Sequence, residues 1–418
     1  MNIRSLEKIG NNALHASRIL TSLDEKIKNK VLNDYIKILK KEIKHILLAN
    51  KKDLSSKSIK NLKKNYLDRM TLNEKKIYNI ILSVQDVIKI KDPTNKIIER
   101  WKRPNGMILE KVSIPFGVVA VIYESRPNVT ADVSTLCFKS GNAVILKGGS
   151  ETTHSNKILS DLFRKALKKN KIDSNVVQFI QDKNRKVVDL LLSKMEKYIN
   201  VIIPRGGKNL VKKVKEKSNV PTIGHLEGVC HTYVDENADL GMAKKVTLNA
   251  KMRNTSICGS TETLLIHKKN IKSHLHPILN LLSIAGCKIK GDKIVVKNFK
   301  RAELATVKDW GKEFLDSIIA VKIVNNIQEA INHINRYGTH HTDAIITDNK
   351  KNAEFFLKKV DSAIVLHNAS TQFADGGEFG FGSEIGISTT KLPPRGPVGL
   401  QQLVTYKYMV RGHGQTRP

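Results

Sequence analysis

The chain has 418 residues and a formal net charge of +33 at pH 7. Hydrophobic residues make up 40% of it, which is enough for a folded protein, yet no window holds the unbroken apolar stretch of a membrane span. The start of the chain does not resemble a signal peptide, and the four cysteines have no spacing typical of zinc binding or a disulfide framework. The sequence therefore predicts a reduced, cytoplasmic protein of two domains, with no membrane segment and no metal site.

The positive charge first suggests binding to nucleic acid, because clustered lysine and arginine displace counterions from phosphates. Here the basic residues are spread over helical segments near 26–65, 164–171 and 208–217, and the aromatic residues, 5% of the chain, are not interleaved with them. We interpret most of the charge as solvated surface and a smaller part as attraction for anionic substrates and cofactor. No nucleic-acid partner is expected, and a nucleic-acid-binding protein on an enzyme-like scaffold is the alternative from another functional class.

The first half of the chain predicts a helical region followed by a parallel sheet. Residues 1–100 read as mostly helical, because apolar residues recur at helical spacing between lysines. At 101–113, an Asn-Gly pair followed by alternation indicates a β-hairpin. The apolar run 116–122 is typical of a strand buried on both faces of a parallel sheet. Further strands are expected at 142–147, 176–180 and 198–203, with helices at 155–169 and 184–195, which together favour a doubly wound α/β domain.

The second half repeats the alternation of strands and helices and predicts a second α/β domain. The glycine-rich segment 375–382 is too dense in glycine for a regular element and is expected to turn tightly or approach a ligand. A final strand-like run at 403–410 could pair, together with the early hairpin, with another subunit. The strand candidates of the second domain are 263–267, 293–296, 320–323, 343–346 and 362–366.

Cys258 is the candidate nucleophile. Small polar residues flank it and the apolar run 264–266 follows, so the thiol is expected on a short turn from which it can reach a cleft. Backbone N–H groups or a helix terminus can lower a thiol pKa at such a place. The alternative is a buried structural cysteine, because free cysteine is among the most often buried residue types. Cys230 is interpreted as a packing residue and His231 is left unassigned.

Two places suit a bound dinucleotide. Gly206 and Gly207 lie between a predicted strand and a predicted helix, where backbone N–H groups and the helix N-terminus can hold a pyrophosphate. The chain has neither a Gly-x-Gly-x-x-Gly motif nor a P-loop, so an ordinary turn is an equal alternative. Lys147 closes a predicted buried strand, at the end where parallel sheets bind nucleotides.

Several motifs together resemble a known family. Segment 141–147 is similar to the cofactor strand of the aldehyde dehydrogenase superfamily, and the full set resembles its gamma-glutamyl phosphate reductase branch nearly end to end. The resemblance implies an α/β, aldehyde dehydrogenase-like fold with two doubly wound α/β domains plus a small β oligomerisation arm. The other motifs are 125–130, 228–235, 251–265, 337–345, 380–389 and 395–400.

The resemblance also implies an organisation and an activity. It implies a cofactor-binding domain at 1–230 with a hairpin arm near 101–114, a catalytic domain at 231–385, and a C-terminal return with an oligomerisation strand at 386–418. The implied activity is NADPH-dependent reduction of L-glutamyl 5-phosphate to L-glutamate 5-semialdehyde and phosphate in proline biosynthesis, by a homo-oligomer, with channelling from glutamate 5-kinase. A dehydrogenase of another semialdehyde or acyl phosphate is the alternative among enzymes.

The resemblance assigns roles to single residues. It implies Cys258 as the nucleophile and Asn128 as a side-chain donor to the oxyanion. Lys147 would contact the adenosine ribose or its phosphate, and Glu313 would hold the nicotinamide ribose. The alternatives are that Asn128 caps the helix after Pro127 and that Glu313 is a solvated charge.

Two departures from the superfamily pattern carry information. Hydrolytic members have an acidic general base at the position of His225, and its absence favours reduction, because an acyl phosphate reductase must keep water off its thioester. Glu227, two residues away, leaves the hydrolytic alternative open. Members that prefer NAD carry an acid at the position of Ser150, which would repel a 2′-phosphate, so the serine with Lys147 nearby favours NADPH.

Overall fold

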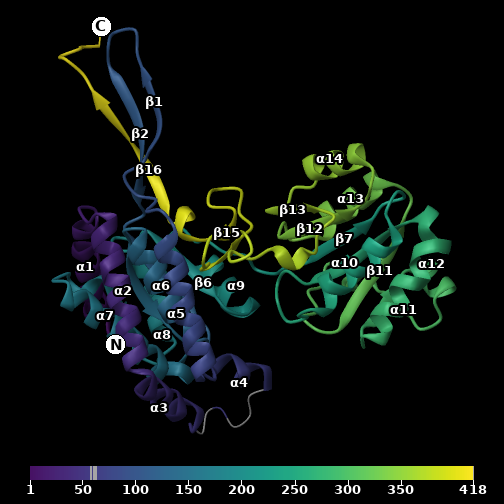
Figure 1. Ribbon diagram of the computed structural model, residues 1–418, viewed down its shortest axis with the longest axis horizontal. Coiled ribbons are helices and arrows are strands. Elements are labelled where there is room, and N and C mark those ends of the chain that lie inside the picture. Colours follow the sequence, from purple (N-terminus) through teal and green to yellow (C-terminus); the bar gives the residue numbers. More distant parts are fainter. Residues whose placement is uncertain (57–58, 60–63, 418) are drawn as a thin grey trace. The chain divides into compact units, whose positions relative to one another are not determined.

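The computed structural model describes residues 1–56, 59 and 64–417 (Figure 1). The chain forms two compact units, and it returns to the first unit twice after building most of the second. The first unit comprises Met1–Gly224, Gly380–Gly386 and Val398–Pro418, and the second comprises His225–Phe379 and Ile387–Pro397.

Helices build the start of the first unit, as the apolar spacing predicts. Three of them begin at a side-chain cap, since Asn2, Asp24 and Asn73 each accept a hydrogen bond from the backbone N–H three residues further on. In the lysine-rich segment near 26–65, residues 57, 58 and 60–63 lie outside the described residues. The helices are α1 (Ile3–Leu20), α2 (Glu25–Lys41), α3 (Ile43–Leu54), α4 (Lys64–Met70) and α5 (Glu74–Lys89).

A four-stranded parallel sheet with the order β5-β4-β3-β6 forms the centre of the first unit. Every residue of β3 and β4 is buried, and alternate residues enter two different core clusters, which is why both strands read as continuous apolar runs. The predicted strands and helices are confirmed. They are β3 (Val118–Tyr123), β4 (Ala143–Lys147), β5 (Val177–Phe179) and β6 (Val201–Arg205), with α6 (Asn128–Lys139), α7 (Thr153–Lys169), α8 (Lys186–Lys194) and α9 (Lys208–Lys217).

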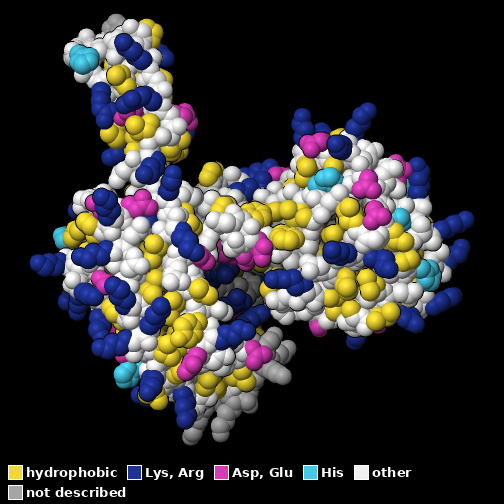
Figure 2. Space-filling model, in the orientation of Figure 1, with side chains coloured by type: hydrophobic (Ala, Val, Ile, Leu, Met, Phe, Trp, Pro, Cys, Tyr) yellow, Lys and Arg dark blue, Asp and Glu magenta, His cyan; other side chains and the backbone are white. Residues whose placement is uncertain are grey.

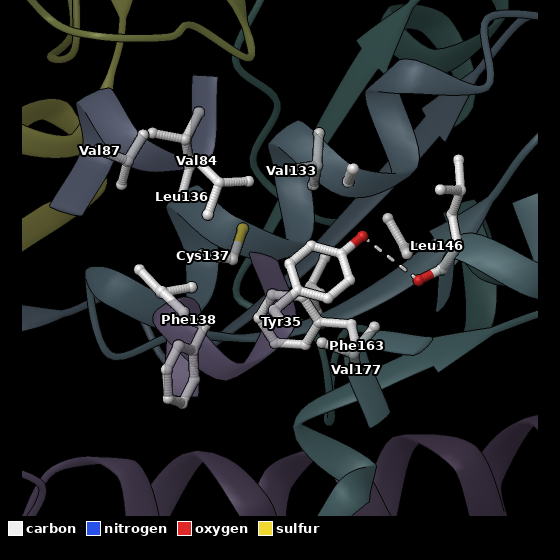
Figure 3. Packing of buried hydrophobic residues seen from close by; sticks show 14 of the residues in the cluster. Tyr35, Val84, Val87, Val133, Leu136, Cys137, Phe138, Leu146, Phe163 and Val177 are labelled. Carbon is white, nitrogen blue, oxygen red and sulfur yellow. Dashed lines mark hydrogen bonds between the residues drawn. The ribbon is translucent and has the colours of Figure 1, made fainter. Parts of the chain in front are cut away.

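Aromatic side chains join the helices to this sheet (Figure 3). The rings of Tyr35 and Phe163 lie 4.7 Å apart between centroids, and Phe138 meets Phe163 edge-on at 5.7 Å. The Tyr35 hydroxyl donates to the Leu159 carbonyl oxygen at 3.4 Å, so its polar end is satisfied inside the core. These contacts attach α2 to α6 and α7.

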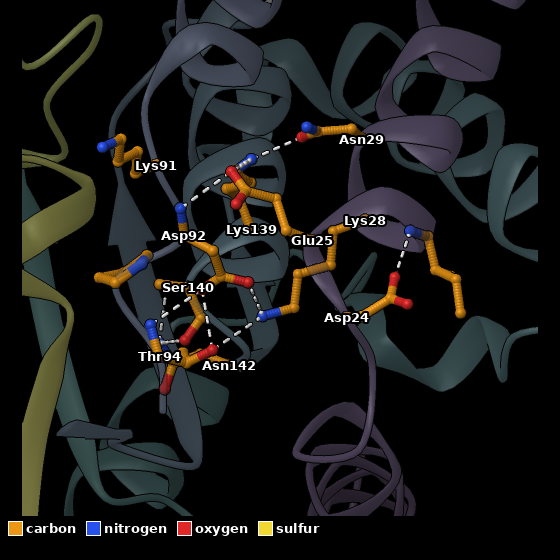
Figure 4. Close-up of polar contacts among 12 residues, drawn as sticks. Asp24, Glu25, Lys28, Asn29, Lys91, Asp92, Thr94, Lys139, Ser140 and Asn142 are labelled. Carbon is orange, nitrogen blue, oxygen red and sulfur yellow. Dashed lines mark hydrogen bonds and ion pairs between the residues drawn. The ribbon is translucent and has the colours of Figure 1, made fainter. Parts of the chain in front are cut away.

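Two buried lysines pair with acids at the rim of the same core (Figure 4). Lys28 donates to the Asp92 carboxylate at 2.6 Å and to Thr94 at 3.2 Å. Lys139 donates to Glu25 at 3.1 Å. Burial lowers the pKa of Lys28, while Asp92 acts in the opposite direction. Part of the large positive charge is therefore structural rather than solvated.

The predicted hairpin and the final strand form an arm of three antiparallel strands, in the order β1-β2-β16. The hairpin turns at Asn105 and Gly106, and Gly106 adopts a positive φ of 88°, as such turns require. Glu110 on the central strand binds both Arg411 and Arg100, and these cations hold the pKa of its carboxyl below its usual value. The strands are β1 (Ile97–Lys102), β2 (Ile108–Pro115) and β16 (Val404–Arg411).

A seven-stranded parallel sheet with the order β10-β9-β11-β8-β7-β12-β13 forms the second unit. It confirms the predicted second α/β fold. Its strands are β7 (Cys230–Val234), β8 (Thr261–His267), β9 (Lys288–Gly291), β10 (Glu303–Leu304), β11 (Ile318–Val324), β12 (Thr342–Ile346) and β13 (Ile364–His367), and its helices are α10 (Leu240–Met252), α11 (His276–Ile284), α12 (Lys293–Asn298), α13 (Ile327–Tyr337) and α14 (Lys350–Lys359). β14 (Gly386–Ser388) pairs with β15 (Gly396–Val398) where the chain passes between the units.

One element prediction is wrong. The run 293–296, expected as a strand, lies in helix α12, and the strand is β9 just before it. The Asp292 side chain accepts a hydrogen bond from the Val295 N–H at 2.8 Å and so starts a helix. A short apolar run does not distinguish a strand from a buried helical turn, and the capping aspartate is the signal that decides it.

Lysine and arginine side chains are scattered over the visible face of each unit (Figure 2). They alternate with apolar and acidic side chains instead of gathering on one element. Among the described residues, no helix combines the length and the apolar character that a bilayer span requires. This distribution agrees with reading most of the charge as solvated surface.

Candidate active site

The Cys258 thiol lies on the turn between α10 and β8, as the small flanking residues predict. It is partly exposed, whereas the other three cysteines are buried. Contacts to the backbone fix the turn from two sides. The Thr371 hydroxyl donates to the Gly259 carbonyl oxygen at 2.6 Å, and the Cys230 thiol donates to the Cys258 carbonyl oxygen at 3.0 Å.

The sheet order explains which segments meet at this turn. β7 lies between β8 and β12, and all three strands are parallel, so their amino ends share one edge of the sheet. Cys258 precedes β8, Gly228 precedes β7, and His341 directly precedes β12. Residues that are far apart in the sequence therefore converge here.

Two histidines accompany the thiol. One ring nitrogen of His225, one of His341 and the Cys258 sulfur all lie within 4.8 Å of one another. The two rings meet edge to face, with centroids 4.7 Å apart. His225 Nδ1 lies 2.7 Å from the Ile387 carbonyl oxygen and must donate to it, so Nε2 is the ring nitrogen left for the Cys258 sulfur.

His341 is fully buried and is oriented by its neighbours. Its Nδ1 contacts the Thr342 hydroxyl at 2.9 Å and the Cys230 sulfur at 3.6 Å. Among the described residues its Nε2 has no hydrogen-bond partner of its own. The Nε2 atom is therefore the one available to act on the Cys258 sulfur.

The histidines set the ionisation of the nucleophile. Burial raises the pKa of the Cys258 thiol, but the interactions with His341 and His225 lower it by more, so the pKa is well below the ordinary value. Burial instead raises the pKa of Cys230 and Cys137, and that of Cys287 to about 12. Of the four thiols, Cys258 alone has a lowered pKa.

Glu313 belongs to the same site. Its carboxylate accepts a hydrogen bond from the Gly228 N–H at 2.9 Å. Burial raises the pKa of Glu313, and the Cys258 charge adds to the rise, while the Gly228 hydrogen bond opposes it. Glu313 is therefore half-buried and held by a backbone contact. Glu227 is half-buried on the segment that leads to β7.

Asn128 is the first residue of α6 in the first unit. The helix cap is Pro127 with no side-chain cap bond, so the capping alternative for Asn128 is wrong. Its amide nitrogen donates instead to Asp132 at 3.0 Å, which leaves the second N–H of that amide for another acceptor. Burial raises the pKa of Asp132, and hydrogen bonds from Asn128 and Ser83 oppose the rise.

A pocket of about 500 Å³ in the first unit contains Asn128. Ionisable residues of both signs line it, together with the Asn128 amide. Such a lining can hold a ligand that carries a positive and a negative group at once. The ionisable residues are Asp68, Arg69, Lys76, Arg126 and Asp132.

Lys147 and Ser150 lie at the carboxyl end of β4, where the sequence predicts them. The Lys147 ammonium is largely buried and donates to the Gly148 carbonyl oxygen at 2.9 Å. Burial lowers its pKa, and the charges of Asp182 and Glu151 oppose the change. Ser150 donates to the carboxylate of Glu151 at 2.9 Å. Ser150 stands where members that prefer NAD carry an acid, and in this chain an acid, Glu151, is the next residue.

Gly206 and Gly207 link β6 to α9, as predicted from their place between a strand and a helix. The N–H of Gly207, the N-cap of α9, donates to the Glu124 carboxylate at 2.8 Å. A Cβ on Gly206 would lie 2.6 Å from the Glu124 side chain. The turn thus holds an internal carboxylate at the helix N-terminus, which is an anion-binding position.

The sequence profile of the Aldehyde dehydrogenase family matches residues 13–283. The gamma-glutamyl phosphate reductase of Rhodopseudomonas palustris (strain HaA2) is 46% identical over 413 residues, which cover 99% of this chain and 96% of that protein. That of Brucella suis biovar 1 is 45% identical, with 99% and 98% covered.

The chain belongs to the gamma-glutamyl phosphate reductases of the aldehyde dehydrogenase family. The crystal structure of the gamma-glutamyl phosphate reductase of Thermotoga maritima has a TM-score of 0.96 and 39% identity, and the match covers 99% of this chain and 100% of that chain. An acetylating aldehyde dehydrogenase from Geobacillus thermoglucosidasius, 16% identical with a TM-score of 0.71, shares the fold. The expected aldehyde dehydrogenase-like fold is confirmed.

Family membership makes the position of His225 informative. His225, which is expected in place of an acidic base, lies beside Cys258, and its imidazole donates to the Ile387 carbonyl oxygen. His341 is the residue that sequence reasoning missed, although it stands inside a motif that carries the resemblance. Its signal in the sequence was only a histidine two residues before the predicted strand 343–346. The structure gathers Cys258 and Glu313 in the second unit, and Asn128, Lys147, Ser150, Gly206 and Gly207 in the first.

Proposed function

We propose that this protein reduces L-glutamyl 5-phosphate to L-glutamate 5-semialdehyde and phosphate, with NADPH as the reductant, in the second step of proline biosynthesis from glutamate. One observation carries the proposal: the chain is 46% identical over 413 residues to a protein named gamma-glutamyl phosphate reductase. The lowered pKa of the Cys258 thiol supports it.

The chemistry begins at the Cys258 sulfur. The thiolate attacks the acyl carbon of the substrate, the bond from that carbon to the phosphate oxygen breaks, and a thioester and inorganic phosphate result. A nicotinamide cofactor held by Lys147, Ser150 and Glu313 would supply the hydride that reduces the thioester carbonyl, and the C–S bond then breaks to give the aldehyde. Cys258 then leaves as a thiolate, and His341 with His225 stabilises that charge both before the attack and after release.

The surroundings of the thioester favour reduction over hydrolysis. Where hydrolytic members have an acid, His225 directs its Nδ1–H to a backbone carbonyl. The Glu313 carboxylate is engaged by the Gly228 N–H at 2.9 Å. Glu227 is the remaining candidate for activating water, which is the hydrolytic alternative.

The edge of the first sheet fits a nicotinamide dinucleotide. Lys147 ends strand β4 and Ser150 follows it, while the Gly206-Gly207 turn follows β6, so both groups lie at carboxyl ends of strands in a parallel sheet. Lys147 and Ser150 would hold the adenosine ribose and its 2′-phosphate, and Glu313 would hold the nicotinamide ribose. A pyrophosphate at the glycine turn would take the place of the Glu124 carboxylate. Ser150 and Lys147 favour NADPH, because they can accept its 2′-phosphate. The neighbouring Glu151 carboxylate opposes this preference, because it would repel that phosphate.

The pocket beside Asn128 supports an amino acid as substrate. An α-ammonium group would be drawn to Asp132 and an α-carboxylate to Arg126, both of which line it. Arg126→Gln should raise KM for the substrate more than it lowers kcat. Asn128 remains the proposed donor to the oxyanion, as family resemblance implies.

The arm supports self-association. Exposed apolar side chains lie on its two outer strands, at Ile97, Ile98, Tyr406, Tyr408 and Val410. We expect a homo-oligomer. Sedimentation compares the oligomeric state of the full chain with that of a variant that has charged residues at 406 and 408, and the variant should dissociate. Channelling from glutamate 5-kinase, and a division into a cofactor-binding and a catalytic unit, belong to the same proposal.

Two assays test the activity directly. Glutamate semialdehyde with phosphate and NADP⁺ should produce NADPH at a rate that depends on all three compounds. The ratio of kcat/KM for NADPH and NADH, measured in the full chain and in Glu151→Gln, tests the cofactor preference. A protein that binds RNA or DNA and has no such activity would contradict the proposal.

A further inference from the structure

The Cys258, His225 and His341 cluster has the composition of a metal site. A thiolate and two imidazoles are the ligands that zinc and similar soft divalent cations take in proteins. Three protein ligands leave one position open for water or another ligand, as at catalytic zinc sites. The three residues are 33 and 83 positions apart in the chain, so no motif in the sequence announces them.

The contacts behind the two rings orient them as metal-bound histidines are oriented. A ligating histidine usually gives its other ring nitrogen to a carbonyl, carboxylate or hydroxyl, which fixes the tautomer. His225 does this with the Ile387 carbonyl at 2.7 Å. His341 contacts the Thr342 hydroxyl at 2.9 Å through Nδ1, and its buried Nε2 has no hydrogen-bond partner among the described residues. Because this nitrogen is buried in the cluster with the Cys258 sulfur, it is the ring atom that an ion shared with the thiol would bind.

The spacing is close to what a single ion needs. With a zinc–sulfur bond of about 2.3 Å and zinc–nitrogen bonds of about 2.0 Å, tetrahedral ligand atoms lie about 3.3 to 3.6 Å apart. Here the three atoms lie within 4.8 Å of one another before any ion is present. Rotation about the Cα–Cβ bond of Cys258 can close the difference of about one ångström, because it moves the sulfur while the backbone of the turn stays in place.

We propose that this site reversibly binds one thiophilic divalent cation, with zinc as the reference ion, through Cys258, His225 and His341. The bound ion takes the lone pair with which Cys258 would attack an acyl carbon, so the metal-bound protein is inactive until the ion leaves. The proposal concerns the cluster itself and does not depend on which substrate the protein reduces.

The test uses the reduced full-length protein and zinc competed against a chromophoric chelator. One ion should bind per chain, and His341→Gln and His225→Gln should each weaken binding about tenfold or more. Cobalt should give a sulfur-to-metal charge-transfer band that Cys258→Ser removes. Controls are His340→Asn, at the exposed neighbouring histidine, and Cys287→Ser, which should bind zinc like the unchanged chain.

A second measurement needs no variant, so it stands even if a substitution prevents folding. Zinc should slow alkylation of Cys258 by iodoacetamide, read by peptide mass spectrometry, and a chelator should restore the rate. An alkylation rate unchanged at saturating zinc, or equal zinc affinity in the ligand variants and the controls, overturns the proposal.

Discussion

Gly228 leaves no space for a side chain beside Cys258, since a Cβ there would lie 2.3 Å from the Cys258 carbonyl oxygen. The Gly228 N–H also donates to Glu313, so Gly228 cannot move away from Cys258 without breaking that hydrogen bond. We expect Gly228→Ala to displace the nucleophile and lower kcat about a hundredfold. Gly311→Ala is the matched control, because its Cβ would meet nothing nearer than 3.6 Å. Full activity in Gly228→Ala would mean that the turn adapts.

The pH dependence of thiol reactivity should reveal the histidine pair. Because His341 lowers the pKa of Cys258, His341→Gln should raise that pKa and move the alkylation profile to higher pH. At neutral pH the variant should react more slowly, since less of its thiol is ionised. His340→Asn keeps a residue that tolerates the positive φ of 59° and should leave the profile in place. An unmoved profile in His341→Gln would remove His341 from the mechanism.

Cys258→Ser should abolish turnover, because a serine hydroxyl lacks thiolate character at neutral pH. NADPH binding, followed by fluorescence, should persist. Cys137, Cys230 and Cys287, changed singly to serine, should retain substantial activity, and Cys230→Ser keeps a donor for the Cys258 carbonyl. Turnover in the Cys258 variant would refute the covalent mechanism.

Asn128→Ala should lower kcat about a hundredfold if its free N–H faces the developing oxyanion. Its thermal stability should change little, since Asn128 makes no cap bond. Asn73 offers the opposite case, because it caps α5 through the Lys76 N–H at 2.8 Å. Asn73→Ala should cost about 1 kcal/mol of stability and leave kcat unchanged. If Asn128→Ala behaves like Asn73→Ala, its role is structural.

Run in the oxidative direction, the enzyme should require added phosphate. The thioester at Cys258 should release to phosphate far faster than to water, so the product should be the acyl phosphate or its cyclised breakdown product. Steady NADP⁺ reduction without phosphate, giving free glutamate, would place a water-activating base in the site. Loss of that reaction in Glu227→Gln would then identify the base.

The elements of this fold were largely readable from the sequence, and the site only in part. Buried strands such as β3 and β4 appear as apolar runs, and Cys258 stands out by its small neighbours. His341 could not be placed, because nothing local tells that β7 inserts between β8 and β12. Strand order is a property of long-range pairing, and it decides which strand ends meet.

The glycine turn at Gly206 and Gly207 illustrates a second kind of limit. Its place between a strand and a helix followed from the pattern, yet the carboxylate that occupies it comes from Glu124, 83 residues earlier than Gly207. Helix α12 shows a third limit: the apolar run 293–296 predicted a strand, but the Asp292 cap starts a helix there. In each case a single side-chain contact decides between structures that share one sequence pattern.

The pairing of β16 with β2 also has a consequence during synthesis on the ribosome. About 290 residues separate Pro115 from Val404, its partner at the start of β16. At 5–20 residues per second, one edge of β2 waits about 15 to 60 s for its own chain to supply the closing strand. An unpaired edge is a template for any strand that arrives first. Two nascent chains on one messenger could therefore exchange their last strands before either has finished folding.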